Sequence, residues 1–414
     1  MRVEVPYLAR HLDFEVPDRN LLAVVEPNEV TLPPGGPTAI LAAALASPRG
    51  SPPFQEFLSG ARQVLVIVND ATRPTPTEAI LDAIGDDLEA RRARFIVATG
   101  AHRGPTEKEY RQIFGRHYER FRDRAEAHDS RDESKLVDLG KTRNGTPILL
   151  NRALVEADRV IATGSVEPHY FAGYTGGRKA FLPGVAGFHT IEANHRLALD
   201  PRARSLALDD NPVSQDMEDA LGHIGGRIFS IMAVLDKHQS LAACEAGDIR
   251  ASFGAAVERA NSIFAVRLPA RADIVVSVAR FPMDIDLYQA QKAIDNGAMA
   301  LADGGILILV ASCRDGVGDR AYIELLGSSK SPAEALAKIG AGFKLGWHKA
   351  AKMAQVSARA SIRAITELDE ATLRKAFIER RDSLAEALVE ALAEKGGDAK
   401  VAVLLDGTVT IPIL

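Results

Sequence analysis

Short runs of apolar, mostly β-branched residues recur along the chain and are separated by helical patterns. Such runs, bounded by turn residues, are typical of buried strands, and their alternation with helices is typical of an α/β protein with mainly parallel sheets. The pattern predicts strands at Val64–Val68, Phe95–Ala98, Val160–Ala162, Ile228–Leu235, Ile274–Val278, Ile306–Val310 and Val401–Leu405. We therefore expect an α/β fold.

Two predicted helices have recognisable starts. Thr75-Pro76-Thr77-Glu78 and Ser331-Pro332-Ala333-Glu334 each place a hydroxyl residue before a proline, with a glutamate positioned to close a capping box. The stretch from 333 to 395 is dense in Ala, Leu, Glu, Lys and Arg, which favours amphipathic helices packed on a sheet.

The length of 414 residues predicts two domains. A helical pattern at 251–263 gives way to a new strand after Leu268-Pro269-Ala270-Arg271, which indicates a boundary there. We expect an N-terminal α/β domain over residues 1–268 and a C-terminal α/β domain over residues 269–398. The last strand, within 399–414, could return to the first domain. The active site is expected in a cleft between the two.

Charge and composition narrow the classes of partner. The chain has 50 Lys and Arg against 55 Asp and Glu, a net charge of -5, so no basic surplus favours nucleic acid. No apolar run approaches a membrane span and the N-terminus lacks a signal-peptide pattern, so we expect a cytoplasmic protein that binds no membrane. The two cysteines, Cys244 and Cys313, are expected to be buried thiols.

Polar loops follow three of the predicted strands, where ligands bind in open α/β sheets. The first loop carries Asp70, Ala71, Thr72 and Arg73 just before a predicted helix, whose N-terminus favours a phosphate or carboxylate. An Asx turn with Arg73 in a surface ion pair fits this loop equally well.

The other two loops each carry a histidine, His102 and His169. Either one alone is most simply a structural residue. As a pair they meet a specific requirement, because inverting a carbon stereocentre needs access to both faces and two imidazoles can exchange acid and base roles.

Gly176-Gly177-Arg178-Lys179 and His195 complete the polar groups of this region. Lys179 is either a simple cation or an amine that bonds covalently to a cofactor. His195 has no HExxH motif, Cys/His cluster or carboxylate trio beside it, so any metal there would need ligands from a bound cofactor.

In the second domain Tyr288 and Lys292 lie one helical turn apart, with Gln289 beside Tyr288. They could hold the carboxylate and hydroxyl of a substrate. Trp347, the only tryptophan, has a half-buried packing role as its default, and a place in the wall of a cleft as the sharper hypothesis.

These residues jointly resemble the nickel-pincer-nucleotide-dependent lactate racemase family of 2-hydroxyacid racemases and epimerases, over nearly the whole chain. The segments that carry the resemblance are Asp70-Ala71-Thr72-Arg73-Pro74, Gly100-Ala101-His102-Arg103, His169-Tyr170-Phe171-Ala172-Gly173-Tyr174-Thr175-Gly176-Gly177-Arg178-Lys179, Glu192-Ala193-Asn194-His195, Tyr288-Gln289-Ala290-Gln291-Lys292 and Gly346-Trp347-His348-Lys349. Thr175 departs from the serine expected at its position.

The resemblance implies a nickel ion held by carbon and two sulfurs of a modified pyridinium mononucleotide, which is joined through a thioamide to Lys179. It implies His195 as the nickel ligand and His102 with His169 as the acid/base pair. The loop from Asp70 to Arg73 would bind the cofactor, and Arg73 could face either the cofactor phosphate or the substrate carboxylate.

By the same resemblance, Gln289 and Lys292 would contact a 2-hydroxy acid. Hydride would leave C2 for the cofactor, and the transient 2-keto acid would regain it on the opposite face. Enzymes that build the cofactor would be partners.

Three alternatives remain open at this level. The chain could be a C2 epimerase of a longer polyhydroxy acid such as an aldonate. It could also carry the nickel nucleotide without turnover, although a carrier has no need of two acid/base histidines. An ordinary nicotinamide dehydrogenase is disfavoured, because no convincing GxGxxG turn lies between a strand and a helix.

Overall fold

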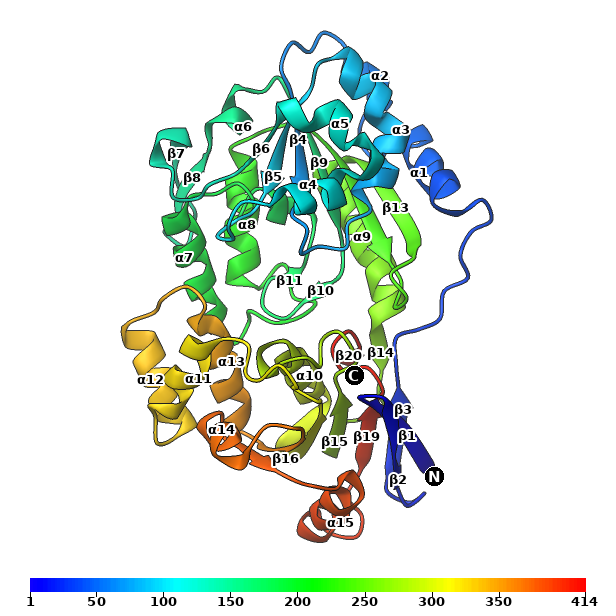
Figure 1. Cartoon of the computed structure of the whole chain (residues 1–414), viewed down its shortest axis with the longest axis vertical. Coiled ribbons are helices and arrows are strands. Elements are labelled where there is room, and N and C mark those ends of the chain that lie inside the picture. The colour runs from blue at the N-terminus through cyan, green and yellow to red at the C-terminus, as the bar shows by residue number, and fades with distance from the viewer. The chain divides into compact units, whose positions relative to one another are not determined.

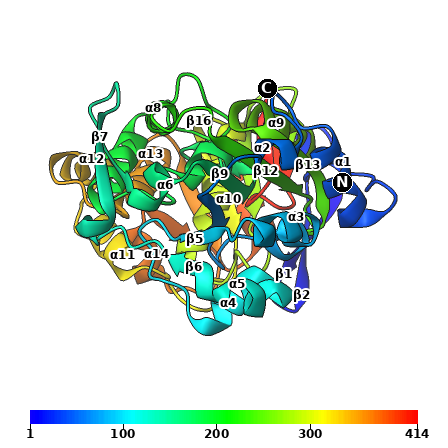
Figure 2. The same ribbon diagram turned by 90° about the horizontal axis from the view of Figure 1, so that it is seen from above.

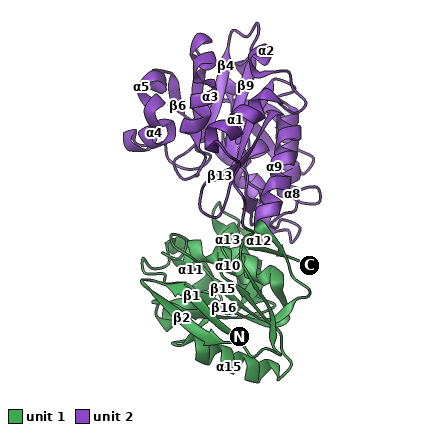
Figure 3. Cartoon of the chain, turned by 90° about the vertical axis from the view of Figure 1, so that its right-hand side faces the viewer, with its two compact units in different colours: residues 1–28, 264–414 green, residues 29–263 purple.

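The predicted alternation of strands and helices is present in the computed structural model, which describes residues 1–414 (Figures 1 and 2). The chain divides into two compact units, shown in Figure 3. Unit 2 comprises residues 29–263, and unit 1 comprises residues 1–28 together with 264–414. Both are α/β units with mainly parallel sheets, as the apolar pattern predicts.

Unit 2 is built on a six-stranded sheet in the order β13-β12-β9-β4-β5-β6, in which only the β12/β13 pair is antiparallel. Its strands are β4 (Val64–Asn69), β5 (Arg94–Ala98), β6 (Ala125–Ala127), β9 (Arg159–Ser165), β12 (Ile228–Leu235) and β13 (Leu241–Asp248). Its helices are α1 (Gly36–Ala46), α2 (Phe54–Phe57), α3 (Thr77–Ala90), α4 (Glu107–Phe114), α5 (Tyr118–Phe121), α6 (Arg152–Glu156), α7 (Phe188–Arg196), α8 (Pro212–Gly222) and α9 (Ile249–Phe264). Two hairpins, β7 (Leu136–Lys141) with β8 (Pro147–Asn151) and β10 (Pro168–His169) with β11 (Gly173–Tyr174), lie outside the main sheet.

Unit 1 is built on an all-parallel sheet in the order β18-β17-β16-β15-β19-β3. Its strands are β3 (Leu21–Val25), β15 (Ala272–Val278), β16 (Leu301–Val310), β17 (Ser361–Ile365), β18 (Ile378–Arg380) and β19 (Val401–Leu404). Its helices are α10 (Leu287–Ala300), α11 (Arg320–Gly327), α12 (Pro332–Ala341), α13 (Trp347–Ser357), α14 (Glu370–Lys375) and α15 (Leu384–Lys395). The hairpin β1 (Arg2–Tyr7) with β2 (Arg10–Glu15) and the short pair β14 (Ala265–Arg267) with β20 (Ile411–Ile413) complete it.

The units differ from the expected division at both chain ends. Residues 1–28 belong to unit 1, because β3 forms an edge of the C-terminal sheet. The C-terminal segment 399–414 does not return to the N-terminal sheet: β19 pairs with β15 on one side and with β3 on the other, and β20 pairs with β14 of the same unit. A short N-terminal strand pairs far along the chain here, which local patterns do not reveal.

Two predictions about the helices need correction. The residue before α3 is Pro76 and no side chain caps that helix, because the Thr75 hydroxyl instead donates to Asn69 at 2.7 Å. Ser331 does cap α12, where it accepts from the amide of Glu334. The stretch from 333 to 395 is not wholly helical, since β17 and β18 lie within it.

Each sheet is covered by apolar side chains that form a separate core. The unit 2 core includes Val66, Phe95, Ile161 and Phe229, all fully buried. Both cysteines are buried and free, as expected. Helix lengths and hydropathy leave no candidate for a membrane-spanning helix.

Candidate active site

Three predicted site residues of unit 2 follow adjacent strands of one sheet. Asp70 follows β4, His102 lies in the loop after β5, and His169 lies in the loop after β9. The chain runs outward from β4 to β5 and β6 on one side, and from β9 to β12 and β13 on the other. The strand order therefore reverses between β4 and β9, and such reversals are where open α/β sheets bind ligands.

Asp70 and His102 form a hydrogen-bonded pair. Oδ2 of Asp70 lies 2.8 Å from Nδ1 of His102, and Oδ1 accepts from the amide of Thr72 at 3.1 Å and from its hydroxyl at 2.5 Å. Burial acts to raise the pKa of Asp70, but the bonds from His102 and Thr72 outweigh it and lower that pKa below its usual value. The carboxylate is thus ionised and fixed, while the His102 side chain is 56% exposed.

The Asx turn considered for this loop is present in the bond from the Thr72 amide to Asp70. The surface ion pair considered for Arg73 is absent, since its guanidinium is exposed and no carboxylate pairs with it. Ala71 is partly exposed beside it. The first loop therefore both orients His102 and presents a cation.

His169 is held by its own hairpin. It ends β10 and pairs with Gly173 of β11, and its Nδ1 accepts from the amide of Ala172 at 3.2 Å. Its ring stacks on Tyr170 with the centroids 5.0 Å apart. The orientation of this imidazole is therefore set by backbone.

One phenyl ring, Phe171, brings together the other chemical groups of unit 2. It is only 2% exposed. The centroids of the His169 and His195 rings lie 4.6 and 5.1 Å from its own, both in edge arrangements, and the ammonium of Lys179 lies 5.6 Å from it. The structure thus gathers three residues that the sequence separates by up to 26 positions around a ring that the sequence analysis assigned no role.

Two glycines let Lys179 reach this position. Gly176 and Gly177 have φ of +73° and +52°, and a Cβ on Gly177 would lie 2.5 Å from the ring of Phe253. The Thr175 hydroxyl donates to the carbonyl of Ser165 at 2.9 Å and accepts from a backbone amide, so threonine fills the role of a loop-closing hydroxyl. The turn Gly177–Ala180 that follows is a short 3₁₀ helix carrying Lys179.

The amine of Lys179 lies in an environment that disfavours its charge. Burial lowers its pKa well below the usual lysine value, and the positive charges of Arg73 and Arg178 lower it further. The guanidinium of Arg178 is buried, bonds to the hydroxyl of Ser214 and stacks over Phe253. Lys179 is therefore disposed to be a neutral nucleophile, which an ordinary surface lysine is not.

His195 lies in the last turn of α7. No group of three or more His, Cys, Asp or Glu side chains that could hold a metal ion is present in the chain. A metal at His195 would accordingly need ligands that are not protein side chains.

In unit 1 the predicted residues Tyr288, Gln289 and Lys292 lie in the first two turns of α10, which follows β15. Asp286 caps this helix by accepting from the amide of Gln289 at 2.7 Å. The ammonium of Lys292 lies 3.2 Å from the sulfur of Met283. The capped helix start therefore fixes the backbone that carries these residues.

Trp347 begins α13 and is partly buried, in line with its default role in packing. Two residues later, the ammonium of Lys349 donates to the carbonyl of Tyr288 and lies 4.0 Å from the centre of its ring. Gln291 also donates to the carbonyl of Lys349, at 2.9 Å. These contacts join α13 to the start of α10, so unit 1 brings Trp347 and Tyr288 into one region.

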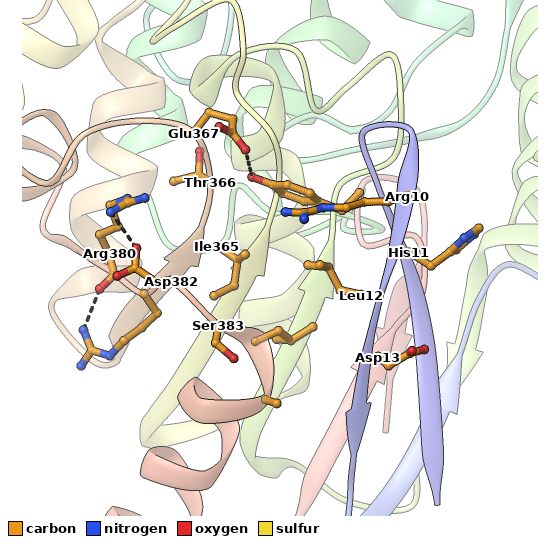
Figure 4. A pocket seen from close by; sticks show the side chains of 14 residues that line it. Arg10, His11, Leu12, Asp13, Ile365, Thr366, Glu367, Arg380, Asp382 and Ser383 are labelled. Atoms are coloured by element: carbon orange, nitrogen blue, oxygen red, sulfur yellow. Dashed lines mark hydrogen bonds and ion pairs between the residues drawn. The ribbon is translucent and has the colours of Figure 1, made fainter.

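A pocket lined by residues of unit 1, shown in Figure 4, lies elsewhere. It has a volume of about 350 Å³, and none of the predicted site residues lines it. Tyr7 donates to Glu367 there at 2.8 Å and Arg380 pairs with Asp382. Its charged groups thus largely satisfy one another, and we assign it no part in the site.

A mainly parallel sheet with titratable side chains after neighbouring strands is typical of α/β enzymes that bind small molecules at the carboxyl edge. Comparison with known proteins gives the family. The family model described as the lactate racemase N-terminal domain matches residues 7–205, and that of the lactate racemase C-terminal domain matches residues 268–412. The chain belongs to the lactate racemase family.

Named relatives agree with this assignment. The chain is 30% identical to a lactate racemase of Lactiplantibacillus plantarum over 98% of each chain, and 30% identical to one of Thermoanaerobacterium thermosaccharolyticum over 81% of this chain and 80% of that one. The structure of the latter organism's lactate racemase apoprotein is similar over the full length of both chains, with a TM-score of 0.92 and 28% identity. A Thermotoga maritima protein shares the fold, with a TM-score of 0.63 and 18% identity over 89% of this chain and 100% of that one. The protein is an enzyme, an isomerase of this family.

Proposed function

We propose that the protein racemises a 2-hydroxy acid of lactate size at C2, with a nickel-pincer nucleotide attached to Lys179. The observation that carries the proposal is the gathering of His169, His195 and Lys179 around Phe171. The names of the relatives support lactate as the first substrate to test.

The residues present fit such a cofactor. An amine whose pKa is lowered by burial and by Arg73 and Arg178 suits a covalent bond to an acyl-type carbon, because only the neutral amine is nucleophilic. His195 would supply the protein ligand to nickel, and the loop from Asp70 to Arg73 would present a cation and backbone amides to an anionic group. When bound, the group supplies a centre that accepts and returns a hydride.

The histidines of the chain would move the proton. Nε2 of one imidazole would take the hydroxyl proton of the substrate, and the other would return a proton to oxygen once the configuration at C2 is inverted. Gln289 and Lys292 would hold the carboxylate, and Tyr288 and Trp347 would border the substrate. Arg73 could serve the cofactor or the substrate.

The test is to produce the chain together with cofactor-building enzymes and to measure intact mass, metal content and racemisation. The proposal expects a mass adduct, about one nickel per chain and conversion of either lactate enantiomer, with all three lost in Lys179→Ala. Arg178→Lys, which keeps a positive charge beside Lys179, is the matched control and should retain the adduct. An unmodified chain that racemises lactate would disprove the covalent cofactor, and an adduct without turnover of lactate or longer 2-hydroxy acids would indicate a carrier.

A further inference from the structure

The two histidines of the proposed acid/base pair have different partners at the same ring atom. Nδ1 of His102 faces the carboxylate of Asp70, whereas Nδ1 of His169 faces the backbone amide of Ala172. An ionised carboxylate can only accept a hydrogen bond and a backbone amide can only donate one. The neutral His102 ring therefore carries its proton on Nδ1, and the neutral His169 ring carries its proton on Nε2.

The partner of His102 is fixed by further contacts. Oδ1 of Asp70 is occupied by the amide and the hydroxyl of Thr72, so that Oδ2 is left for the imidazole. The carboxylate is buried, which restricts its rotation. His169 is held differently, because its Nδ1 partner is a backbone amide of its own hairpin.

We infer that the two histidines start turnover in opposite roles, with Nε2 of His102 as the proton acceptor and Nε2–H of His169 as the proton donor. This inference rests on the proposed function. Asp70 is then a positioning residue that sets the tautomer of His102, in addition to any contact its loop makes with a cofactor. Two histidines with the same kind of Nδ1 partner would instead have the same tautomer and no preferred roles.

The proton balance is closed by the two rings and water. The O–H bond of the substrate breaks as an N–H bond forms at Nε2 of His102, and the resulting imidazolium faces the Asp70 carboxylate. The O–H bond of the product forms as the N–H bond at Nε2 of His169 breaks, while the proton gained by His102 passes through water to the same nitrogen of His169. This coupled transfer leaves both rings neutral and restores the starting tautomers.

The resting protein is consequently ready for the enantiomer whose hydroxyl meets His102. The hydroxyl of the other enantiomer meets His169, whose Nε2 already carries a proton, and that proton must first move through water toward His102 before Nε2 of His169 can accept another. Racemisation has an equilibrium constant of one, so kcat/KM must be equal for the two enantiomers. The additional proton transfer would therefore appear as a lower kcat for the enantiomer whose hydroxyl meets His169.

The direct test is nitrogen NMR of the full chain with ¹⁵N-labelled histidine, without cofactor, at about pH 8.5, above the ordinary pKa of an imidazole. Two-bond proton correlations distinguish protonated from unprotonated ring nitrogens, and His102→Gln and His169→Gln assign the signals. The inference expects Nδ1–H at His102 and Nε2–H at His169. The same tautomer at both rings would overturn it.

Asp70→Asn tests the positioning role. The two donors of Thr72 would retain the side-chain oxygen, so the new amide N–H group would face Nδ1 of His102 and convert that ring to the Nε2–H tautomer. Thr72→Ala is the control, since it leaves the carboxylate and should preserve Nδ1–H at His102. An unchanged His102 signal in Asp70→Asn would remove the role assigned to the carboxylate.

Activity of the matured enzyme gives a second readout. Glutamine can neither take up nor release a proton at the substrate oxygen, so His102→Gln and His169→Gln should each lower kcat by about 10²- to 10⁴-fold. Full turnover in either variant would contradict the role assigned to that ring. Opposite tautomers in a matured chain without racemisation would refute the proposed function, whereas identical tautomers in an active enzyme would refute this inference alone.

Discussion

The polar groups that follow the strands of the unit 2 sheet and those packed between helices α10 and α13 of unit 1 are in very different states. In unit 2, His102 is oriented by Asp70 and remains more than half exposed. In unit 1, Lys349 is buried against Tyr288, and burial raises the pKa of Asp295 on the same helix, α10, to about 6. The unit 2 groups can exchange protons with a ligand, whereas the unit 1 groups hold two helices together. Under the proposed function, we expect unit 2 to supply the acid/base groups and unit 1 to contact the substrate.

The largest expected effect comes from replacing the two site histidines of unit 2, which tests whether this unit supplies the acid/base groups. His102→Ala and His169→Ala should each lower kcat by about 10²- to 10⁴-fold, because each removes an acid/base group, and should leave the nickel content unchanged. Chiral chromatography of lactate and metal analysis check both. His223→Ala, an exposed histidine in the same unit, is the control and should behave as the wild type. Full turnover in both site variants would end the two-histidine scheme.

Unit 1 variants should instead change binding. Lys292→Met keeps the length of the side chain and removes one charge-assisted contact, so KM should rise about 10- to 100-fold while kcat changes less. Initial rates over a range of lactate concentration separate the two constants. Lys338→Met, on the exposed face of α12, is the matched control. A fall in kcat with KM unaltered would contradict a binding role for this helix.

The buried charges of unit 1 predict a pH effect on stability. Burial lowers the pKa of Lys349 to about 7, whereas the unfolded chain keeps that proton to about pH 10.4. Between these values the unfolded state binds more protons, so this lysine makes the free energy of unfolding rise with pH. From pH 7 to 9 the wild type should gain on the order of 1–2 kcal/mol relative to Lys349→Met.

Urea unfolding at the two pH values measures this difference. Lys344→Met, an exposed lysine near Trp347, serves as the control and should show no relative change. A constant difference between the wild type and Lys349→Met would show that Lys349 titrates normally in the folded state.

The smallest expected effect concerns Thr175 in unit 2. Thr175→Ser keeps both hydroxyl bonds and should cost less than about 1 kcal/mol, because it loses only a methyl group. Thr175→Ala should cost about 1 kcal/mol more, since it leaves a buried carbonyl and amide with fewer partners. Thermal unfolding of both variants ranks them. Equal stability would show that the hydroxyl does not close the loop.

Local pattern predicted the sheets well. The apolar runs at 64–68 and 228–235 coincide with β4 and β12 to within a residue, because buried parallel strands are continuously apolar. The membership of β3 in unit 1 was missed, since pairing between positions 21–25 and 401–404 depends on the folded chain. The prediction that Thr75 caps a helix was wrong for a related reason. Its hydroxyl bonds instead to Asn69 and Ser165, which end two neighbouring strands.

The site was predicted in part. Parallel topology was enough to bring Asp70 close to His102, because β4 and β5 are neighbours and their following loops share one edge. The roles of Phe171 and the Ala172 amide were not foreseen. A buried phenylalanine and a backbone N–H carry no chemical signature in a sequence, because their contacts form only when the chain folds.

The contacts of Phe171 limit how this enzyme could be engineered. Its ring is the shared neighbour of His169, the proposed proton donor, of the cofactor-bearing Lys179 and of His195, the proposed metal ligand. Trimming it to admit a bulkier acid would release all three from their common support. Substrate range would have to be altered through other side chains, and the start of α10 in unit 1 is the first place to attempt it.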